Sequence, residues 1–243
     1  VTLIAPRAEM GQGVQTTLAA LVAEEMDLDW DQVRVLHGPA SRAYLNSAVF
    51  EDAAPFMPTD EGWLAETARG AMQVPARFLG LQIAGGSSST PDAFEKMRAA
   101  GAMARAALVA AAQRRSGVAE GALKTSGGAV VLPDGTRIPY SDLAVEAAAL
   151  ELPSPPPLKS RADWKLLGRS LPRTDMLGKV TGTAQYTADF RHPDMLFATA
   201  RSNPGLGAEL TSYDATAALA MAGVTAVVEV PNGLAVVANS TWV

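Results

Sequence analysis

The sequence predicts a mixed fold in which an α/β layer is followed by a smaller α+β unit. In the first part, short β-prone apolar runs alternate with longer stretches of helical periodicity. After a proline-rich segment, the apolar runs become short and closely spaced. The chain has 243 residues, of which 48% are hydrophobic and 19% charged. This composition describes a globular protein with a core of substantial size.

The amino-terminal segment predicts a strand–helix–strand unit. Val1–Ala5 is a candidate strand, and the two glycines of Met10-Gly11-Gln12-Gly13 allow a tight turn after it. Val14–Asp27 places apolar residues at helical spacing, and Val33–His37 is a second candidate strand. Because a helix joins the two strands, we expect them to be parallel with a right-handed crossover.

The next region has little regular pattern. Prolines interrupt every period between Gly38 and Pro75, so we expect a long loop with a helical piece near Gly62–Met72. Phe78–Ala84 is an apolar run that predicts a strand.

A second glycine turn, Gly85–Pro91, introduces a long alanine-rich helix that includes Phe94–Arg115. Thr90 is the expected N-cap, because a threonine followed by a proline is typical of a helix start. Gly117 is the expected end of the helix.

The remainder of the chain predicts short elements on both sides of a proline-rich boundary. Before the boundary we expect a hairpin of Thr125–Leu132 and Arg137–Tyr140, and then a helix over Asp142–Leu150. Leu152–Pro157 reads as a stiff linker. Beyond it we expect four strands and one short helix; the strands are Tyr186–Phe190, Leu196–Arg201, Val224–Val230 and Leu234–Ala238, and the helix is Asp214–Met221.

Composition excludes several kinds of chemistry. Twenty Lys and Arg against 25 Asp and Glu give a net charge of −5, which disfavours nucleic acid as a partner. The absence of cysteine excludes zinc–thiolate sites, protein-ligated iron–sulfur clusters and a cysteine nucleophile in this chain. There are two histidines, and we interpret His37 as structural. Glu24, Glu25 and Asp27 are interpreted as a solvated face. We therefore assign no catalytic and no metal-ligating residue.

The two glycine turns are the candidate site, because each lies at the start of a predicted helix. A helix start exposes unpaired N–H groups that bind phosphate without any Lys or Arg. The candidate cofactor-binding residues are Gly11, Gln12, Gly13, Gly86, Ser87, Ser88 and Ser89. The alternative interpretation is two ordinary capped turns. A dinucleotide fingerprint is incomplete, since Thr16 stands where its third glycine belongs.

The segment Glu9-Met10-Gly11-Gln12-Gly13-Val14-Gln15-Thr16 resembles the cofactor-binding segment in the large subunit of molybdenum hydroxylases. The resemblance is to the isoquinoline 1-oxidoreductase β-subunit branch of the xanthine dehydrogenase and aldehyde oxidase family. Gly85–Thr90 looks like a second family segment, and Leu177–Asp189 resembles the start of the family's α/β hammerhead domain. The resemblance implies a partial molybdopterin-binding α/β domain over residues 1–152, a linker and connecting segment over 153–176, and a partial hammerhead domain over 177–243.

The resemblance also implies a function. Gln12, Ser87 and Ser89 would contact a molybdopterin cytosine dinucleotide carrying molybdenum. The enzyme would hydroxylate an N-heterocycle or oxidise an aldehyde, both small-molecule substrates, with oxygen from water. Electrons would pass to iron–sulfur clusters on a small partner subunit, and then to a cytochrome or another acceptor.

The family's catalytic Gly-Glu motif does not occur in this sequence. We therefore expect this chain to be inactive alone and to need the remainder of the large subunit, or a second polypeptide that carries it. The resemblance favours a periplasmic over a cytoplasmic location. The alternative function is a non-catalytic nucleotide-binding or assembly module with the same fold.

Overall fold

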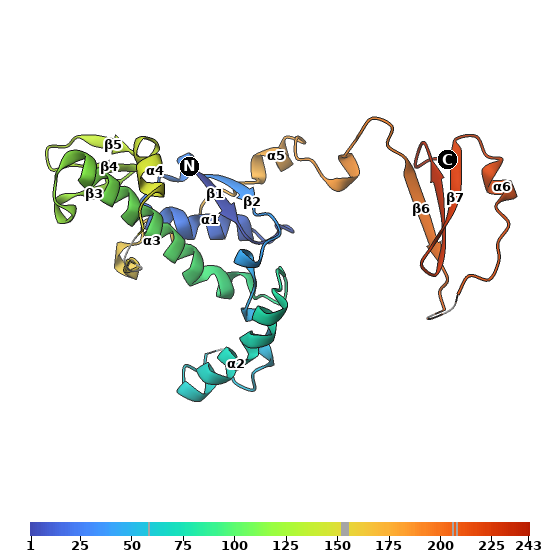
Figure 1. The fold of residues 1–243 in the computed structure, drawn as a ribbon, viewed down its shortest axis with the longest axis horizontal. Coiled ribbons are helices and arrows are strands. Elements are labelled where there is room, and N and C mark those ends of the chain that lie inside the picture. Colours follow the sequence, from blue (N-terminus) through green and yellow to red (C-terminus); the bar gives the residue numbers. More distant parts are fainter. Residues whose placement is uncertain (58, 152–155, 206, 208) are drawn as a thin grey trace. The chain divides into compact units, whose positions relative to one another are not determined.

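A computed structural model of the protein describes residues 1–57, 59–151, 156–205, 207 and 209–243. The chain divides into two compact units, Val1–Gly182 and Thr183–Val243, and each is described by itself (Figure 1).

The first unit begins with the predicted parallel strand–helix–strand arrangement. β1 (Thr2–Ala5) pairs in parallel with β2 (Arg34–His37), and Leu3 lies opposite Val35. α1 (Val14–Glu25) connects the two strands. The prediction of this unit is confirmed.

α3 (Ser89–Ser116) packs along α1 in the same direction. Near the start of both helices, Val14 and Ala93 belong to one apolar cluster. Further along, Gly101 lies so close to α1 that an added Cβ would be 2.7 Å from the carbonyl oxygen of Val22. Contacts that advance together along two helices mean that the helices run parallel, so their amino-terminal turns lie at the same end. The predicted end of α3 is confirmed at Gly117, whose φ is +72°.

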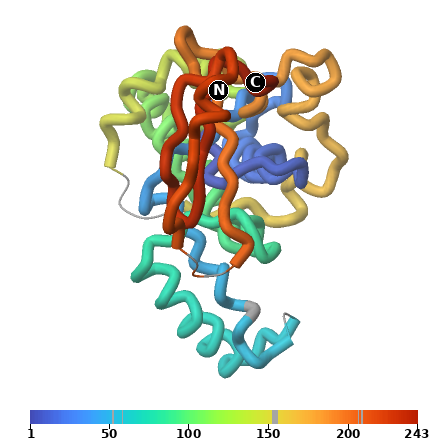
Figure 2. Tube along the Cα trace, turned by 90° about the vertical axis from the view of Figure 1, so that its right-hand side faces the viewer, coloured from blue at the N-terminus to red at the C-terminus, as the bar shows by residue number. Residues whose placement is uncertain are grey.

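The region before α3 differs from the prediction. α2 (Trp63–Leu79) is longer than the expected helical piece and continues through Pro75. The strand expected at Phe78–Ala84 is wrong, because α2 includes its first residues and ends at Gly80, in the left-handed region with φ of +64°. A short apolar run does not by itself distinguish a strand from the end of a helix. α2 extends away from the rest of the first unit (Figures 1 and 2).

A small antiparallel sheet follows α3. It consists of β3 (Lys124–Ser126), β4 (Ala129–Val131) and β5 (Arg137–Pro139), and it leads into α4 (Tyr140–Ala148). The predicted hairpin is confirmed, because β4 pairs antiparallel with β5 and Val130 lies opposite Ile138. Its first arm is shorter than predicted: Gly127 and Gly128 both have positive φ and form a tight turn, which adds β3 as a third strand. Val130 and Leu143 are fully buried in the main core, which also includes parts of α1 and α3.

The first unit continues past the proline-rich run as far as Gly182. Residues 152–155 of that run lie outside the described part of the chain, so the predicted linker is seen only from Pro156 onward. Residues 159–175, which we call the strap, pack against α1, and α5 (Met176–Val180) follows them. The described residues also form short 3₁₀ turns: η1 (Trp30–Gln32), η2 (Arg42–Tyr44), η3 (Ala48–Ala53), η4 (Glu120–Ala122), η5 (Arg161–Asp163) and, in the second unit, η6 (Thr187–Asp189).

The second unit is an antiparallel sheet of order β6-β8-β7. Its strands are β6 (Phe197–Ser202), β7 (Val224–Val230) and β8 (Gly233–Ala238), with α6 (Thr216–Leu219) before β7. The three corresponding predictions are confirmed. The strand expected at Tyr186–Phe190 is wrong, since η6 lies there. The Asp189 carboxylate accepts the Tyr186 N–H at 3.0 Å and closes this turn.

Candidate functional site at two glycine turns

The two glycine turns lie at the same end of the first unit, because α1 and α3 run in parallel. Val14, the first residue of α1, and Ala93, near the start of α3, belong to the same apolar cluster, so both helices begin at that end. A cavity of about 230 Å³ lies beside both turns; it is lined by Pro6, Arg7, Ala8, His37, Ala40, Gln82, Ile83 and Ala84. These residues follow β1, follow β2 and precede the second turn. Ligands of open α/β sheets bind at such carboxyl ends of parallel strands.

The first turn is closed by an acidic side chain of its own. The Glu9 carboxylate accepts the N–H groups of Gly11 (2.9 Å), Gly13 (2.8 Å) and Gln15 (3.2 Å). Desolvation would raise the pKa of Glu9, but these backbone hydrogen bonds and Arg173 outweigh it, and the pKa is lowered. Three N–H groups at and before the start of α1 are therefore already bound by an internal anion.

Gln12 is also folded into the first turn. Its side-chain oxygen accepts the Met10 N–H at 2.6 Å, and its side-chain nitrogen donates to the Ala8 carbonyl at 3.0 Å. Gly11 and Gly13 have φ of +107° and +83°, which other residues rarely adopt. The predicted residues of this turn are thus brought together, but Gln12 must leave its present hydrogen bonds before its amide can contact a ligand.

In the second turn, Ser88 has a structural role. Its side chain is buried, donates to the Gly85 carbonyl at 2.6 Å and accepts from the Asn46 amide at 2.8 Å. Asn46 is itself fully buried and also donates to the Ile83 carbonyl. Ser88, not Thr90, precedes the first residue of α3. This serine holds the turn to the preceding loop and is not available to a ligand.

The other groups of the second turn are open. Within the described part of the chain, the hydroxyl groups of Ser87 and Ser89 have no hydrogen-bond partner, and the N–H groups of Ser89 and Thr90 have no acceptor. Gly86 and Ser87 both have positive φ, at 59° and 53°. The start of α3 therefore keeps the donors that an anion requires, in contrast to the start of α1.

A buried ion pair beside the second turn was not predicted from the sequence. Asp92, in the first turn of α3, binds the Arg7 guanidinium, the N–H and hydroxyl of Ser47, and the Lys96 ammonium. Desolvation opposes the charge of Asp92, but these hydrogen bonds outweigh it and lower its pKa. Since Arg7 follows β1, the pair fixes the end of β1 to the start of α3. A lone acid at position 92 and an arginine at position 7 carry no signal of this in the sequence.

Two interpretations of polar residues are corrected by the structure. His37 is not a satisfied structural histidine; its side chain is exposed, lines the cavity, and makes no hydrogen bond within the described residues. Glu24 and Glu25 do not form a solvated face, because their exposed fractions are 1% and 0%. They bind the strap, whose polar groups compensate their burial. Among the described residues, no group of three or more acidic or histidine side chains is placed to hold a metal ion.

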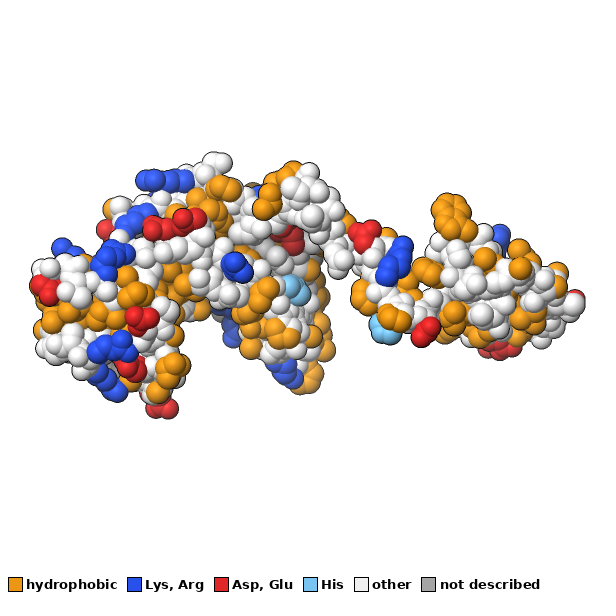
Figure 3. Space-filling view, turned by 90° about the horizontal axis from the view of Figure 1, so that it is seen from above, with side chains coloured by type: hydrophobic (Ala, Val, Ile, Leu, Met, Phe, Trp, Pro, Cys, Tyr) orange, Lys and Arg blue, Asp and Glu red, His pale blue; other side chains and the backbone are white. Residues whose placement is uncertain are grey.

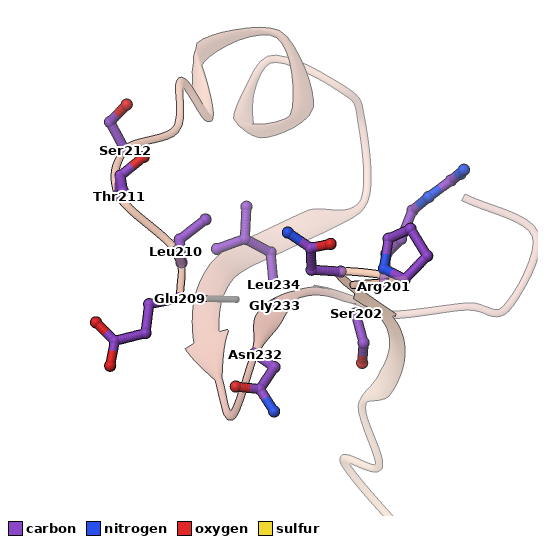
Figure 4. A pocket seen from close by; sticks show the side chains of 11 residues that line it. Arg201, Ser202, Glu209, Leu210, Thr211, Ser212, Asn232, Gly233 and Leu234 are labelled. Atoms are coloured by element: carbon purple, nitrogen blue, oxygen red, sulfur yellow. The ribbon is translucent and has the colours of Figure 1, made fainter. Parts of the chain in front are cut away.

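The second unit has a cavity of about 450 Å³ between the β6–β8 end of its sheet and Glu209–Ser212. Leu210 and Leu234 face each other there, while the Arg201 side chain extends away (Figure 4). Lys179 lies in the first unit, where its ammonium group pairs with the Asp175 carboxylate. Neither cation supports an anion site beside this cavity.

No family model matches the chain. Among curated proteins, the isoquinoline 1-oxidoreductase subunit beta of Brevundimonas diminuta is 30% identical over 100% of this chain and 32% of its own length. The membrane-bound aldehyde dehydrogenase [pyrroloquinoline-quinone] of Gluconacetobacter polyoxogenes is 27% identical over 92% of this chain and 25% of its own. The nicotinate dehydrogenase large molybdopterin subunit of Eubacterium barkeri is 39% identical over 28% of this chain and 16% of its own.

The chain spans about a third or less of the length of these relatives. The first match covers all of this chain, including both glycine turns, the second covers 92% of it, and both relatives are oxidoreductases by name. This agrees with the resemblance read from the turns and from Leu177–Asp189. The chain therefore fits a molybdopterin-binding large subunit of the isoquinoline 1-oxidoreductase group, since its whole length matches the subunit beta of that name and 28% of it matches a large molybdopterin subunit.

Proposed function

We propose that this chain holds part of a molybdopterin cytosine dinucleotide in a molybdenum hydroxylase, and that the start of α3 binds an anionic group of that cofactor. The observation that carries the proposal is the set of open donors at the second turn: the hydroxyls of Ser87 and Ser89 and the N–H groups of Ser89 and Thr90. These donors lie at the same end as the strand-end cavity, and the relatives supply the cofactor class.

The two turns differ in how readily their hydrogen-bond donors can bind an anion. The second turn accepts a phosphate without rearrangement. The first turn has its N–H groups bound by Glu9, so it would contact a ligand through the close backbone approach at Gly11 and Gly13, and through Gln12 once that amide turns outward. When bound, the molybdenum cofactor supplies the redox chemistry that hydroxylates an N-heterocycle or oxidises an aldehyde with oxygen from water.

The proposal assigns the remaining parts of the enzyme to other polypeptide segments. The rest of the large subunit supplies the catalytic carboxylate, and a small subunit with iron–sulfur clusters passes electrons to a cytochrome or another acceptor. Apolar side chains reach the surface over both units, for example Trp63 (78% exposed), Phe78 (80%) and Trp242 (95%) (Figure 3). Exposed aromatic groups of this size favour contact with further protein.

We propose a periplasmic location for the assembly. Among the described residues, no helix is long and apolar enough to cross a bilayer.

A second candidate function is a non-catalytic nucleotide-binding or assembly module. The observation that favours it is the first turn, where Glu9 already occupies the N–H groups that a second phosphate would use. A chain that keeps the fold but no longer loads the cofactor would retain such a closed turn.

The test is the cofactor content of the native polypeptide that contains this chain, purified with its co-purifying partners. Molybdenum is measured by mass spectrometry of the metal, pterin by fluorescence after oxidation, and cytosine monophosphate by chromatography after acid hydrolysis. We expect all three in equal amounts, and a lower content in the Ser87→Ala/Ser89→Ala double variant than in the Ser141→Ala control. Preparations with pyrroloquinoline quinone or with no pterin would contradict the proposal.

A further inference from the structure

The strap runs along α1 from its carboxyl end to its amino end. Lys159 and Lys165 contact acidic groups at the end of α1, namely Glu24 and Asp27. Fourteen residues after Lys159, Arg173 contacts Glu9 and Gly11 before the start of α1. A segment more than 130 residues downstream in sequence thus reaches the first glycine turn.

The strap is fixed firmly at the carboxyl end of α1. One oxygen of the buried Glu24 carboxylate accepts the N–H groups of Lys165 (2.8 Å), Leu166 (2.6 Å) and Leu167 (3.1 Å). Glu25 accepts the Lys159 N–H at 3.1 Å and pairs with Arg98 of α3. Buried carboxylates satisfied in this way hold the strap in one register on α1.

At the amino end of α1, the strap is fixed beside the first turn. The Thr16 hydroxyl accepts the Thr174 N–H at 3.1 Å, and the Trp30 indole N–H donates to the Pro172 carbonyl at 2.9 Å. These two contacts place Arg173, the residue between Pro172 and Thr174, over the turn.

Arg173 contacts both the backbone and the acid of the turn. Its guanidinium donates to the Gly11 carbonyl at 2.8 Å and lies 3.4 Å from the Glu9 carboxylate. Asp175 orients the same guanidinium through two hydrogen bonds of 2.9 and 2.8 Å. Within the contacts described, Arg173 is the cation that faces Glu9.

We propose that Glu9 and Arg173 are a positioning pair for the first glycine turn. Glu9 gathers three N–H groups of the turn, and Arg173 compensates its charge while binding the Gly11 carbonyl. Together they hold the left-handed backbone at Gly11 and Gly13 and set the direction in which Gln12 leaves the turn. The cofactor part of this proposal rests on the proposed function, while the positioning part does not.

The positioning part is tested by amide hydrogen exchange of the chain, residue by residue, in Arg173→Ala and Arg173→Lys. We expect exchange at Gly11, Gly13 and Gln15 to rise roughly tenfold in Arg173→Ala, with the rest of α1 unchanged. Arg173→Lys should restore part of the protection, since it keeps the charge near Glu9. The matched control is Arg169→Ala, an exposed strap arginine whose side chain makes no hydrogen bond or ion pair within the described residues, which should leave all three amides unchanged.

Unchanged protection in Arg173→Ala would overturn the positioning pair. Equal loss of protection along the whole of α1 would also overturn it, because that result would mean that Arg173 stabilises the packing of the strap on α1 in general and does not position the first turn.

The cofactor part is tested in the native holoenzyme by pterin content per polypeptide. We expect a lower content in Arg173→Ala than in Arg169→Ala, and equal contents would overturn this part. If the unsubstituted enzyme holds no pterin, the proposed function fails, and the exchange experiment still decides the positioning pair.

Discussion

The two glycine turns look alike in sequence and differ in the state of their hydrogen-bond donors. The first turn directs three N–H groups at Glu9, whereas the second leaves the N–H groups of Ser89 and Thr90 without an acceptor in the described part of the chain. The difference arises from Glu9, whose carboxylate lies two positions before the first glycine and accepts N–H groups of the residues that follow. A glycine-rich helix start is therefore not an anion site until its donors have been accounted for.

The largest expected effect on stability concerns the buried Arg7–Asp92 ion pair beside the second turn. Asp92→Asn leaves the buried Arg7 guanidinium without its counterion, so we expect a loss of about 3–5 kcal/mol in the free energy of unfolding. Urea denaturation measures it. Glu95→Gln is the matched control, since Glu95 is an exposed acid of the same helix. A loss equal to that of the control would show that the pair does not support the turn.

A second prediction concerns the parallel packing that brings both turns to one end. Gly101→Ala places a Cβ against the Val22 carbonyl and should destabilise the chain by about 1–3 kcal/mol. Gly70→Ala in α2 is the control, because an added Cβ there meets nothing within 4 Å. That change should stabilise α2 by about 0.5–1 kcal/mol. Thermal unfolding of the two variants should shift in opposite directions; shifts of the same sign would contradict the close helix contact.

The serines of the second turn should separate into structural and available residues. Ser88→Ala removes the acceptor of the buried Asn46 amide and should cost about 1–2 kcal/mol. Ser89→Ala should change stability by less than about 0.5 kcal/mol, because its hydroxyl contacts nothing described. Chemical denaturation of both variants decides this, and equal losses would mean that Ser89 is also structural.

The smallest expected effect is the pH dependence of the first turn. The pKa of Glu9 is lowered in the folded chain from its ordinary value of 4.5, so the unfolded chain binds the proton more tightly. The stabilisation is therefore present above pH 4.5 and is lost as the pH falls through the lower folded-state pKa. Glu9→Gln should cost roughly 1 kcal/mol at neutral pH and reduce the slope of stability against pH below 4.5. The free energy of unfolding of the unsubstituted chain and of Glu9→Gln is measured by denaturation from about pH 3 to about pH 7. Identical slopes of stability against pH in the two chains would show that Glu9 does not close the turn.

The sequence predicted the elements with strong local signals. Gly13, Gly117, the two amino-terminal strands and the three strands of the second sheet have boundaries marked by local chemistry, and these predictions hold. The strand predicted at Phe78–Ala84 is wrong because a short apolar run is compatible with either a strand or the end of a helix. The interpretation of Glu24 and Glu25 as solvated failed for another reason: their partners in the strap lie more than 130 residues away, and Arg98 lies 73 residues from Glu25, beyond the reach of any local pattern. The same holds for Asp92 and Arg7, whose contact depends on tertiary structure.

A fragment of the first unit must include the strap if its buried carboxylates are to keep their hydrogen-bond donors. A fragment that ends at Pro157 would remove every N–H group that now binds Glu24 and would strip Glu25 of the Lys159 N–H. Two carboxylates would then face an uncovered surface in a helix that otherwise packs as core. An autonomous fragment should accordingly end at Gly182, about 25 residues beyond the prolines that mark the apparent boundary in the sequence.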